Sequence, residues 1–286
     1  MGHLRAKQPV PVCYTRGMQP PTRSQFPFWQ VQKPGQPLFS ATAWNKPEQR
    51  TQAGRLGIIG GNKLGFAGVA SAYSAAHTAG VGEVRVLLPQ ALQSSLPPSM
   101  VEATFAPSNT SGSLARDAIS QMRALGAWAG MILLAGDAGR SSETAITYDD
   151  FIRDYHGPLV LTRDAIDLVA ASHPQLLERP DTLFVASFAQ VQKLLTSVYY
   201  PKMLTFSMQL LQLVDVLHKF TITYPTTVVT LHKDNLVIAH GGQVVTQQWT
   251  NPMLLWRGEA AAHIASWYLW SPRQPLHAAA TAICEL

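Results

Sequence analysis

The chain has 286 residues, of which 14% are charged and 47% hydrophobic, and its mean hydropathy is +0.03. This composition is typical of a globular protein with a large core, and it excludes global disorder. No stretch approaches the roughly 18 uncharged apolar residues of a membrane span. Two cysteines, Cys13 and Cys284, are too few for a disulfide scaffold or a multi-cysteine zinc site. With no secretory signal visible, we expect a cytoplasmic protein without membrane contact.

The charge is concentrated at the N-terminus. Residues 1–55 carry a net charge of +7 and the remainder −2, and the first 50 residues contain eight prolines and seven glutamines. We therefore predict a Pro/Gln-rich basic extension over residues 1–53 and one domain over residues 54–286. The basic residues form no run of Lys or Arg, so a nucleic-acid partner is not expected.

Short apolar runs along the domain alternate with segments of helical spacing. Strands are predicted at residues 56–60, 83–88, 131–135, 159–162, 182–186, 227–231, 236–239 and 244–246. Helices are predicted over residues 66–79, 113–125 (with Ser113 as its cap), 142–155, 165–170, 188–195, 205–220, 260–270 and 276–284. This alternation indicates a three-layer α/β fold with a mostly parallel sheet, and His240–Gln243 predicts a late antiparallel hairpin.

Ligands of open α/β sheets bind at the carboxyl ends of the strands, so the residues there are the candidates for a site. Gly61 and Asn62 lie in a Gly-rich turn after the first predicted strand, and this kind of turn exposes backbone N–H groups to phosphate. Asp137 follows the third strand and Asp164 the fourth. A tight turn, an Asx turn and a helix N-cap are the respective structural alternatives for these residues.

A second candidate region lies near the C-terminus, from Asn251 to His263. Gly258 precedes a predicted helix and Glu259 opens it, which stabilises the ionised carboxylate and suits a general base. The alternative is an ordinary acidic residue in a first helical turn. Glu259 and His263 share a helix face, but no third ligand is evident, so no metal site is predicted. No nucleophile motif is present.

The order of these segments resembles the ribokinase-like superfamily, and within it the ADP/ATP-dependent NAD(P)H-hydrate dehydratases. The matching segments are Gly54-Arg55, the strand and turn at 56–62, the helix at 66–80, the strand at 84–89, Gly136–Arg140 and residues 158–166. The resemblance implies a ribokinase-like sandwich, Mg-ATP or Mg-ADP as cofactor, and phosphorylation of a small-molecule hydroxyl. In the dehydratase, phosphate is then eliminated from hydrated NAD(P)H.

The resemblance also implies roles for individual residues. Its anion-hole and base motif falls on residues 255–259, which places Glu259 as the catalytic base and Gly258 and Arg257 at the phosphate. The family's lysine near the nucleotide phosphates falls on His232, with Lys233 one position further. The residues implied to bind substrate are Gly61, Asn62, Asp137, Asp164 and Asn251.

The active-site motifs depart from the family pattern. Leu255 and Trp256 replace glycines, Glu259 replaces an aspartate, and the chain stops at Leu286 in a helix after which the family continues. We therefore expect a C-terminally shortened, divergent relative in which catalysis is rebuilt or lost, and in the latter case a ligand-sensing or protein-binding module. The alternatives are an active nucleotide-dependent dehydratase or kinase and, more remotely, an NAD-binding oxidoreductase. A homo-oligomer is possible in each case.

Overall fold

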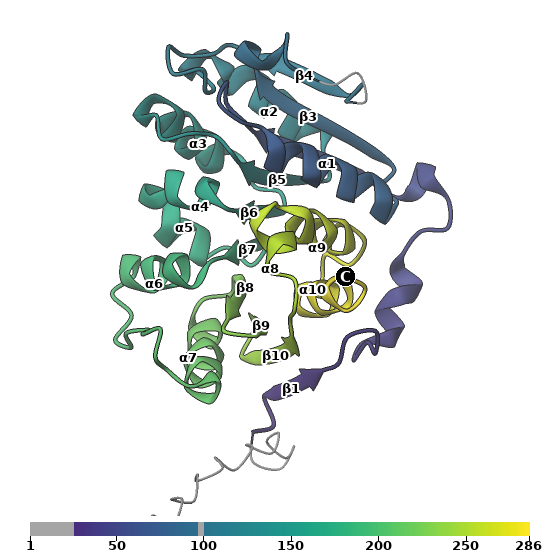
Figure 1. The fold of residues 1–286 in the computed structure, drawn as a ribbon, viewed down its shortest axis with the longest axis vertical. Helices are drawn as coiled ribbons and strands as arrows, with labels where there is room; N and C mark the ends of the chain where they lie inside the picture. Colours follow the sequence, from purple (N-terminus) through teal and green to yellow (C-terminus); the bar gives the residue numbers. More distant parts are fainter. Residues whose placement is uncertain (1–25, 97–99) are drawn as a thin grey trace, which may run out of the picture.

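The computed structural model of the chain describes residues 26–96 and 100–286 (Figure 1). Within these ranges ten strands form one sheet in the order β1-β10-β9-β8-β7-β6-β5-β2-β3-β4. The strands are β1 (Trp29–Gln32), β2 (Arg55–Gly60), β3 (Glu83–Pro89), β4 (Ala103–Ala106), β5 (Met131–Gly136), β6 (Leu159–Thr162), β7 (Thr182–Ala186), β8 (Thr227–His232), β9 (Asn235–His240) and β10 (Gln243–Gln248).

The sheet is parallel except around β9, which pairs antiparallel with both β8 and β10. Central strands such as β5 are buried along their whole length, because helices cover both faces of the sheet. The prediction of a mostly parallel sheet with a late antiparallel hairpin is thus confirmed. The β9–β10 turn is formed by Gly241 and Gly242, both with positive φ, as a two-residue hairpin loop requires.

The helices divide between the two faces of the sheet (Figure 1). Those packed in the core of one face are α2 (Ile119–Trp128), α3 (Ser142–Asp154), α4 (Asp164–Leu168), α5 (His173–Leu177), α6 (Phe188–Ser197) and α7 (Leu210–Thr223). The opposite face is covered by α1 (Ala67–Ala79), α9 (Glu259–Trp270) and α10 (Pro275–Cys284), with the short α8 (Pro252–Trp256) beside α9. Short 3₁₀ helices lie at Ser40–Asn45, Arg50–Gln52, Gln90–Leu92, Arg116–Ala118 and Ala170–Ser172. None of the helices in the described ranges is long and apolar enough to cross a membrane.

Residues 26–53 pack along the outside of the sheet and of the C-terminal helices. β1 pairs in parallel with β10, and the buried Gln32 amide donates to the side chain of Gln247 (2.7 Å) and to Ala280 O (2.8 Å). Further along, the Trp270 indole N–H donates to Ala53 O (3.0 Å). This part of the N-terminal extension therefore contacts the domain. Residues 1–25, with Cys13, lie outside the described residues, and the domain boundary at residue 54 stays a prediction.

Several elements differ from the sequence prediction: the short helices α5 and α8 were not predicted, α7 begins at Leu210 instead of residue 205, and two short strands and the start of α2 also differ. β1 and β4 have four residues each and no sustained apolar run, so they were not predicted. The helix predicted from Ser113 was placed too early, because α2 begins at Ile119. Ser113 instead belongs to a loop that Asn109 holds through its side-chain oxygen, which accepts the N–H groups of Ser111 and Ser113.

Candidate functional site

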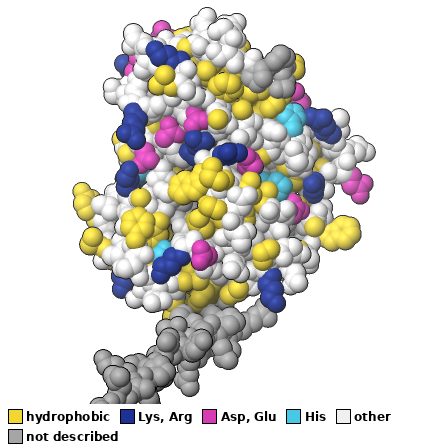
Figure 2. Space-filling model, viewed as in Figure 1, with side chains coloured by type: hydrophobic (Ala, Val, Ile, Leu, Met, Phe, Trp, Pro, Cys, Tyr) yellow, Lys and Arg dark blue, Asp and Glu magenta, His cyan; other side chains and the backbone are white. Residues whose placement is uncertain are grey.

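A cavity of about 340 Å³ opens at the carboxyl ends of β5, β6, β7 and β8, beneath α8. It is lined by Asp137, Thr162, Arg163, Asp164, Asp167, Val185, Ala186, Ser187, Gln190, Leu231, Leu255 and Trp256. Figure 2 shows hydrophobic, acidic and basic side chains close together in the middle of the face toward the viewer. The position agrees with the general rule for ligand sites in open α/β sheets.

An ion pair between Asp137 and Arg163 lies at the inner side of this cavity. Arg163 Nη2 lies 2.5 Å from Asp137 Oδ1, and the other carboxylate oxygen accepts the backbone N–H of Gly68 at 2.6 Å. Gly68 is in the first turn of α1, where free N–H groups make helices attractive to anions. The Asp137 carboxylate thus occupies a position at which a bound phosphate would find a donor.

The ion pair is tightly enclosed and its backbone is strained. A Cβ atom at Gly68 would lie 1.9 Å from Arg163 Nη1, and one at Gly258 would lie 3.3 Å from Gly68 O. Asp137 and Arg163 both have positive φ, 55° and 57°, which non-glycine residues seldom adopt. Strain of this kind concentrates at functional sites. Space between the start of α1 and Gly258 is therefore filled by side chains of the protein itself.

The remaining acidic residues of the cavity are held by hydrogen bonds. Asp164 does not cap α4 but accepts the backbone N–H of Asp137 at 2.6 Å. Asp167 accepts from the Gln190 amide at 2.7 Å and pairs with Lys193 at 2.5 Å. Burial acts to raise the pKa of Asp167, but these two partners outweigh it and the pKa is lowered. Asp167 is therefore ionised at neutral pH.

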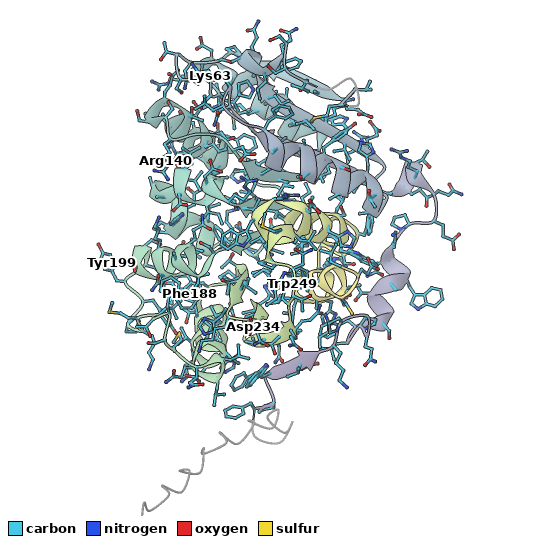
Figure 3. The ribbon with its side chains drawn as sticks, viewed as in Figure 1. Lys63, Arg140, Phe188, Tyr199, Asp234 and Trp249 are labelled. Atoms are coloured by element: carbon cyan, nitrogen blue, oxygen red, sulfur yellow. The ribbon has the colours of Figure 1, made fainter. Side chains whose placement is uncertain are left out.

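Gly61 and Asn62 lie next to this cluster, and their role in binding a substrate stays a prediction. The Asn62 amide donates to Asp137 O at 2.7 Å, and Gly61 has a φ of +81° in the turn after β2. The exposed cations Lys63 and Arg140 come from the same loops and lie in the upper half of Figure 3. Neither has an ion-pair partner among the described residues.

His232 and Lys233 are placed differently from each other, although they are adjacent in sequence. The buried His232 ring donates through Nε2 to Met208 O (2.9 Å) and stacks on Phe188 at 5.1 Å. Lys233 is exposed in the β8–β9 turn with a φ of 52°. Asp234, the next residue in this turn, lies in the lower half of Figure 3. Neither His232 nor Lys233 lines the cavity.

The segment before α9 carries the remaining candidates. Gly258 is the N-cap of α9 with a φ of +85°, and Glu259 is half-buried in the first turn of that helix. Arg257 and Asn251 are exposed, and their side chains have no hydrogen-bond partner within the described residues. The backbone oxygen of Asn251 accepts the indole N–H of Trp249. Trp256 is 52% exposed, and it lines the cavity together with Leu255.

Two residues of the site were missed by the sequence reasoning. Arg163 and Gln190 carry much of the site's hydrogen bonding, because Gln190 donates to Arg163 O as well as to Asp167. The sequence places Arg163 directly after a predicted buried strand, where a partly buried cation requires a partner. That partner is Asp137 in the loop after β5, which only the three-dimensional structure brings close.

The side chains that line the cavity offer little free positive charge to a phosphate group. Arg163 is the one cation that lines the cavity, and its charge is taken up by Asp137. No cluster of three or more potential metal ligands occurs in residues 26–96 and 100–286. Phosphate sites need unpaired positive charge or free backbone N–H groups, and here the Gly68 N–H is already bonded.

The fold is that of the ribokinase-like α/β sandwich. A solved ribokinase-like superfamily protein from Enterococcus faecalis superposes with a TM-score of 0.66 at 15% identity, over 91% of this chain and 87% of that one. The ADP/ATP-dependent NAD(P)H-hydrate dehydratase from Bacillus subtilis, crystallised with ATP/Mg²⁺ and soaked with CoA, gives a TM-score of 0.56 at 14% identity and 86% coverage of both chains. A phosphomethylpyrimidine kinase from Clostridium difficile gives 0.51 at 11% identity, covering 81% of this chain and 100% of that one.

The comparison with protein-family models finds no match, and neither does the comparison with curated protein sequences. The likeness to the solved structures therefore establishes the fold and confirms the resemblance expected from the order of the segments.

Proposed function

We propose that this chain is a divergent ribokinase-like protein that binds a small molecule in the cavity beneath α8 and has lost phosphoryl transfer. The observation that carries the proposal is the ion pair between Asp137 and Arg163, which engages the N–H of Gly68 in the first turn of α1 and fills the space up to Gly258. A cytoplasmic location and a homo-oligomer belong to the same proposal.

The physical argument is that phosphoryl transfer depends on positioning and on stabilisation of negative charge. Here the positive charge of Arg163 is neutralised by Asp137, and the same carboxylate would repel a transferring phosphoryl group. Leu255 and Trp256 stand where the resembled motif has glycines, which restricts φ and adds bulk. These features favour binding without catalysis.

An active nucleotide-dependent dehydratase or small-molecule kinase is the second candidate. It is favoured by Gly258 and Glu259, which keep the glycine-acid order at the start of α9. Glu259 is half-buried, and its side chain has no hydrogen-bond or ion-pair partner among the described residues. In that case Glu259 would remove the proton from the accepting hydroxyl. Arg257 and the Gly258 N–H would then face the phosphate.

Assays of the full chain with hydrated NADH and either ATP or ADP, with Mg²⁺ present, separate the two candidates. We expect no nucleotide-dependent loss of the hydrate above the protein-free rate, and the same result for Glu259→Gln. Removing a general base costs about 10²- to 10⁴-fold in rate. Turnover by the parent chain that falls by this factor in Glu259→Gln would contradict the proposal and support the active enzyme. Circular dichroism of both proteins controls for folding.

A further inference from the structure

We propose that the ligand of the cavity is a small organic cation, an amine with a compact apolar body, and not a phosphorylated nucleotide. This inference rests on the proposed function, because it assigns a ligand class to the same cavity. It is carried by the sign of the charges that line the cavity, by the hydrogen-bonding groups left free there, and by its apolar wall.

The charges that line the cavity are mostly negative. Three aspartates face it against one arginine, which leaves a formal charge of −2. Arg163 is held by Asp137, while Lys193 pairs with Asp167 from outside the lining residues. The Lys193–Asp167 pair is exposed, with side-chain exposures of 62% and 40%, so solvent screens it and it shields the cavity weakly. A polyanionic ligand would therefore meet net repulsion.

The hydroxyl and amide donors of the wall are already used by the protein, whereas most N–H groups of Arg163 and the indole N–H of Trp256 have no partner among the described residues. The Thr162 hydroxyl donates to Val185 O at 3.2 Å, and the Ser187 hydroxyl donates to the Gln190 side-chain oxygen at 3.1 Å. Both amide hydrogens of Gln190 are engaged, as described above. Acceptors remain, because Asp164 uses Oδ1 for the Asp137 N–H and its other oxygen has no partner among the described residues. The free oxygen of Asp164 can therefore accept a charge-assisted hydrogen bond from a cationic ligand.

Part of the lining is apolar and aromatic. Val185, Leu231 and Leu255 line the cavity together with Trp256, which is about half exposed. An indole face attracts cations, and the combination of an aromatic face with carboxylates is suited to ammonium groups. A volume of about 340 Å³ is at the lower end of small-molecule pockets, so it fits a compact ligand.

The inference is tested on the full chain with three probes that share a phenyl body and differ in charge. They are 2-phenylethylamine, 2-phenylethanol and 3-phenylpropionate, measured by titration calorimetry and ligand-observed NMR. We expect the amine to bind at least about tenfold more tightly than the carboxylate, with the alcohol between them, in accord with one charge-assisted hydrogen bond. This preference should weaken as salt is raised.

Variants locate the preference in the cavity. Asp164→Asn keeps the acceptor for the Asp137 N–H while removing the charge, so the amine's advantage should fall to about threefold or less. Asp167→Asn removes a charge at the exposed end of the cavity and provides a second test if the first variant folds poorly. The matched control is Asp215→Asn, which removes one charge from an exposed pair with Lys219 on α7, outside the cavity, and should leave the preference unchanged.

The outcomes separate this inference from the proposed function. If 3-phenylpropionate binds as tightly as the amine, or if the amine shows no binding at about 10 mM with the protein folded, the assignment of an organic cation is wrong. The proposed loss of catalysis would be unaffected by that result. Nucleotide-dependent turnover that is lost in Glu259→Gln would overturn the proposed function, whatever the order of the three probes.

Discussion

Two groups of segments lie at the same end of the fold but differ in how firmly they are held. The first group consists of the loops after β2, β5 and β6, and the second consists of the segments around residues 232–234 and 251–257. In the first group, Asn62, Asp137 and Asp164 bond to one another's backbone or to α1. In the second, Lys233 and Arg257 are exposed and Trp256 is half exposed. The resembled catalytic motifs fall mostly on the second group.

This difference indicates that the two groups of segments have diverged in different ways. The first group forms a network of hydrogen bonds within the protein and leaves one oxygen of Asp164 without a partner among the described residues. Next to the second group the glycine at position 258 is kept, but Leu255 and Trp256 replace glycines of the resembled motif. Binding at the first group and loss of transfer at the second are therefore compatible.

The largest expected effect concerns the close approach of β2 and β5. A Cβ atom at Gly60 would lie 2.3 Å from Gly136 O, a backbone atom that can move only with its strand. We expect Gly60→Ala to reduce the free energy of unfolding by about 3 kcal/mol, measured by urea denaturation. Gly65→Ala, in the same turn but with no atom within 4 Å of the new Cβ, is the control and should cost less than about 0.5 kcal/mol. Equal effects would show that the loop is less closely packed than described.

Much of this arrangement could be predicted from the sequence, because it depends on apolar periodicity and on glycines next to strands. The central strands, the main helices of both layers and the His240–Gln243 turn follow from these local signals. β1 could not be recognised, because Trp29–Gln32 lies in a Pro/Gln-rich segment and gains its stability from pairing with β10, more than 200 residues away.

The site was less predictable, since its contacts join residues that no local pattern relates. Asp137 and Asp164 were candidates from their positions after strands, and they do lie together. That Arg163 would turn toward Asp137 depends on the space left by Gly68, which is 95 positions away in sequence. His232 aligns with a phosphate-side lysine of the family, yet Phe188 and Met208 enclose it.

The next effect is the coupling between Asp137 and Arg163, whose side chains are 16% and 26% exposed. A double-mutant cycle with Asp137→Ala and Arg163→Ala should give a coupling free energy of about 1.5 kcal/mol, because the pair is partly desolvated. The exposed pair of Arg123 and Asp154 serves as the reference and should give less than about 0.5 kcal/mol. A coupling free energy near zero for Asp137 and Arg163 would mean that backbone strain at both residues cancels their attraction. The ion pair would then no longer support the inference that side chains fill the phosphate position.

The smallest expected effect lies in the second group, at the β8–β9 turn. Lys233 has a positive φ as the first residue of a two-residue hairpin loop, a position at which glycine is preferred. We expect Lys233→Gly to increase the free energy of unfolding by about 0.5 kcal/mol, since relief of backbone strain exceeds the added entropy of the unfolded chain. Asp234→Gly is the matched control, because Asp234 has no positive φ and should lose stability instead.

The same Lys233→Gly variant bears on function. If Lys233 took the role of the family's lysine near the nucleotide phosphates, a chain without it would bind ATP more weakly. The cavity wall does not include Lys233, so we expect the binding of 2-phenylethylamine to be unchanged in the variant while stability rises. A loss of stability together with weaker nucleotide binding would instead show that the strained turn is maintained for the nucleotide, and that the phosphate side of the site is still in use.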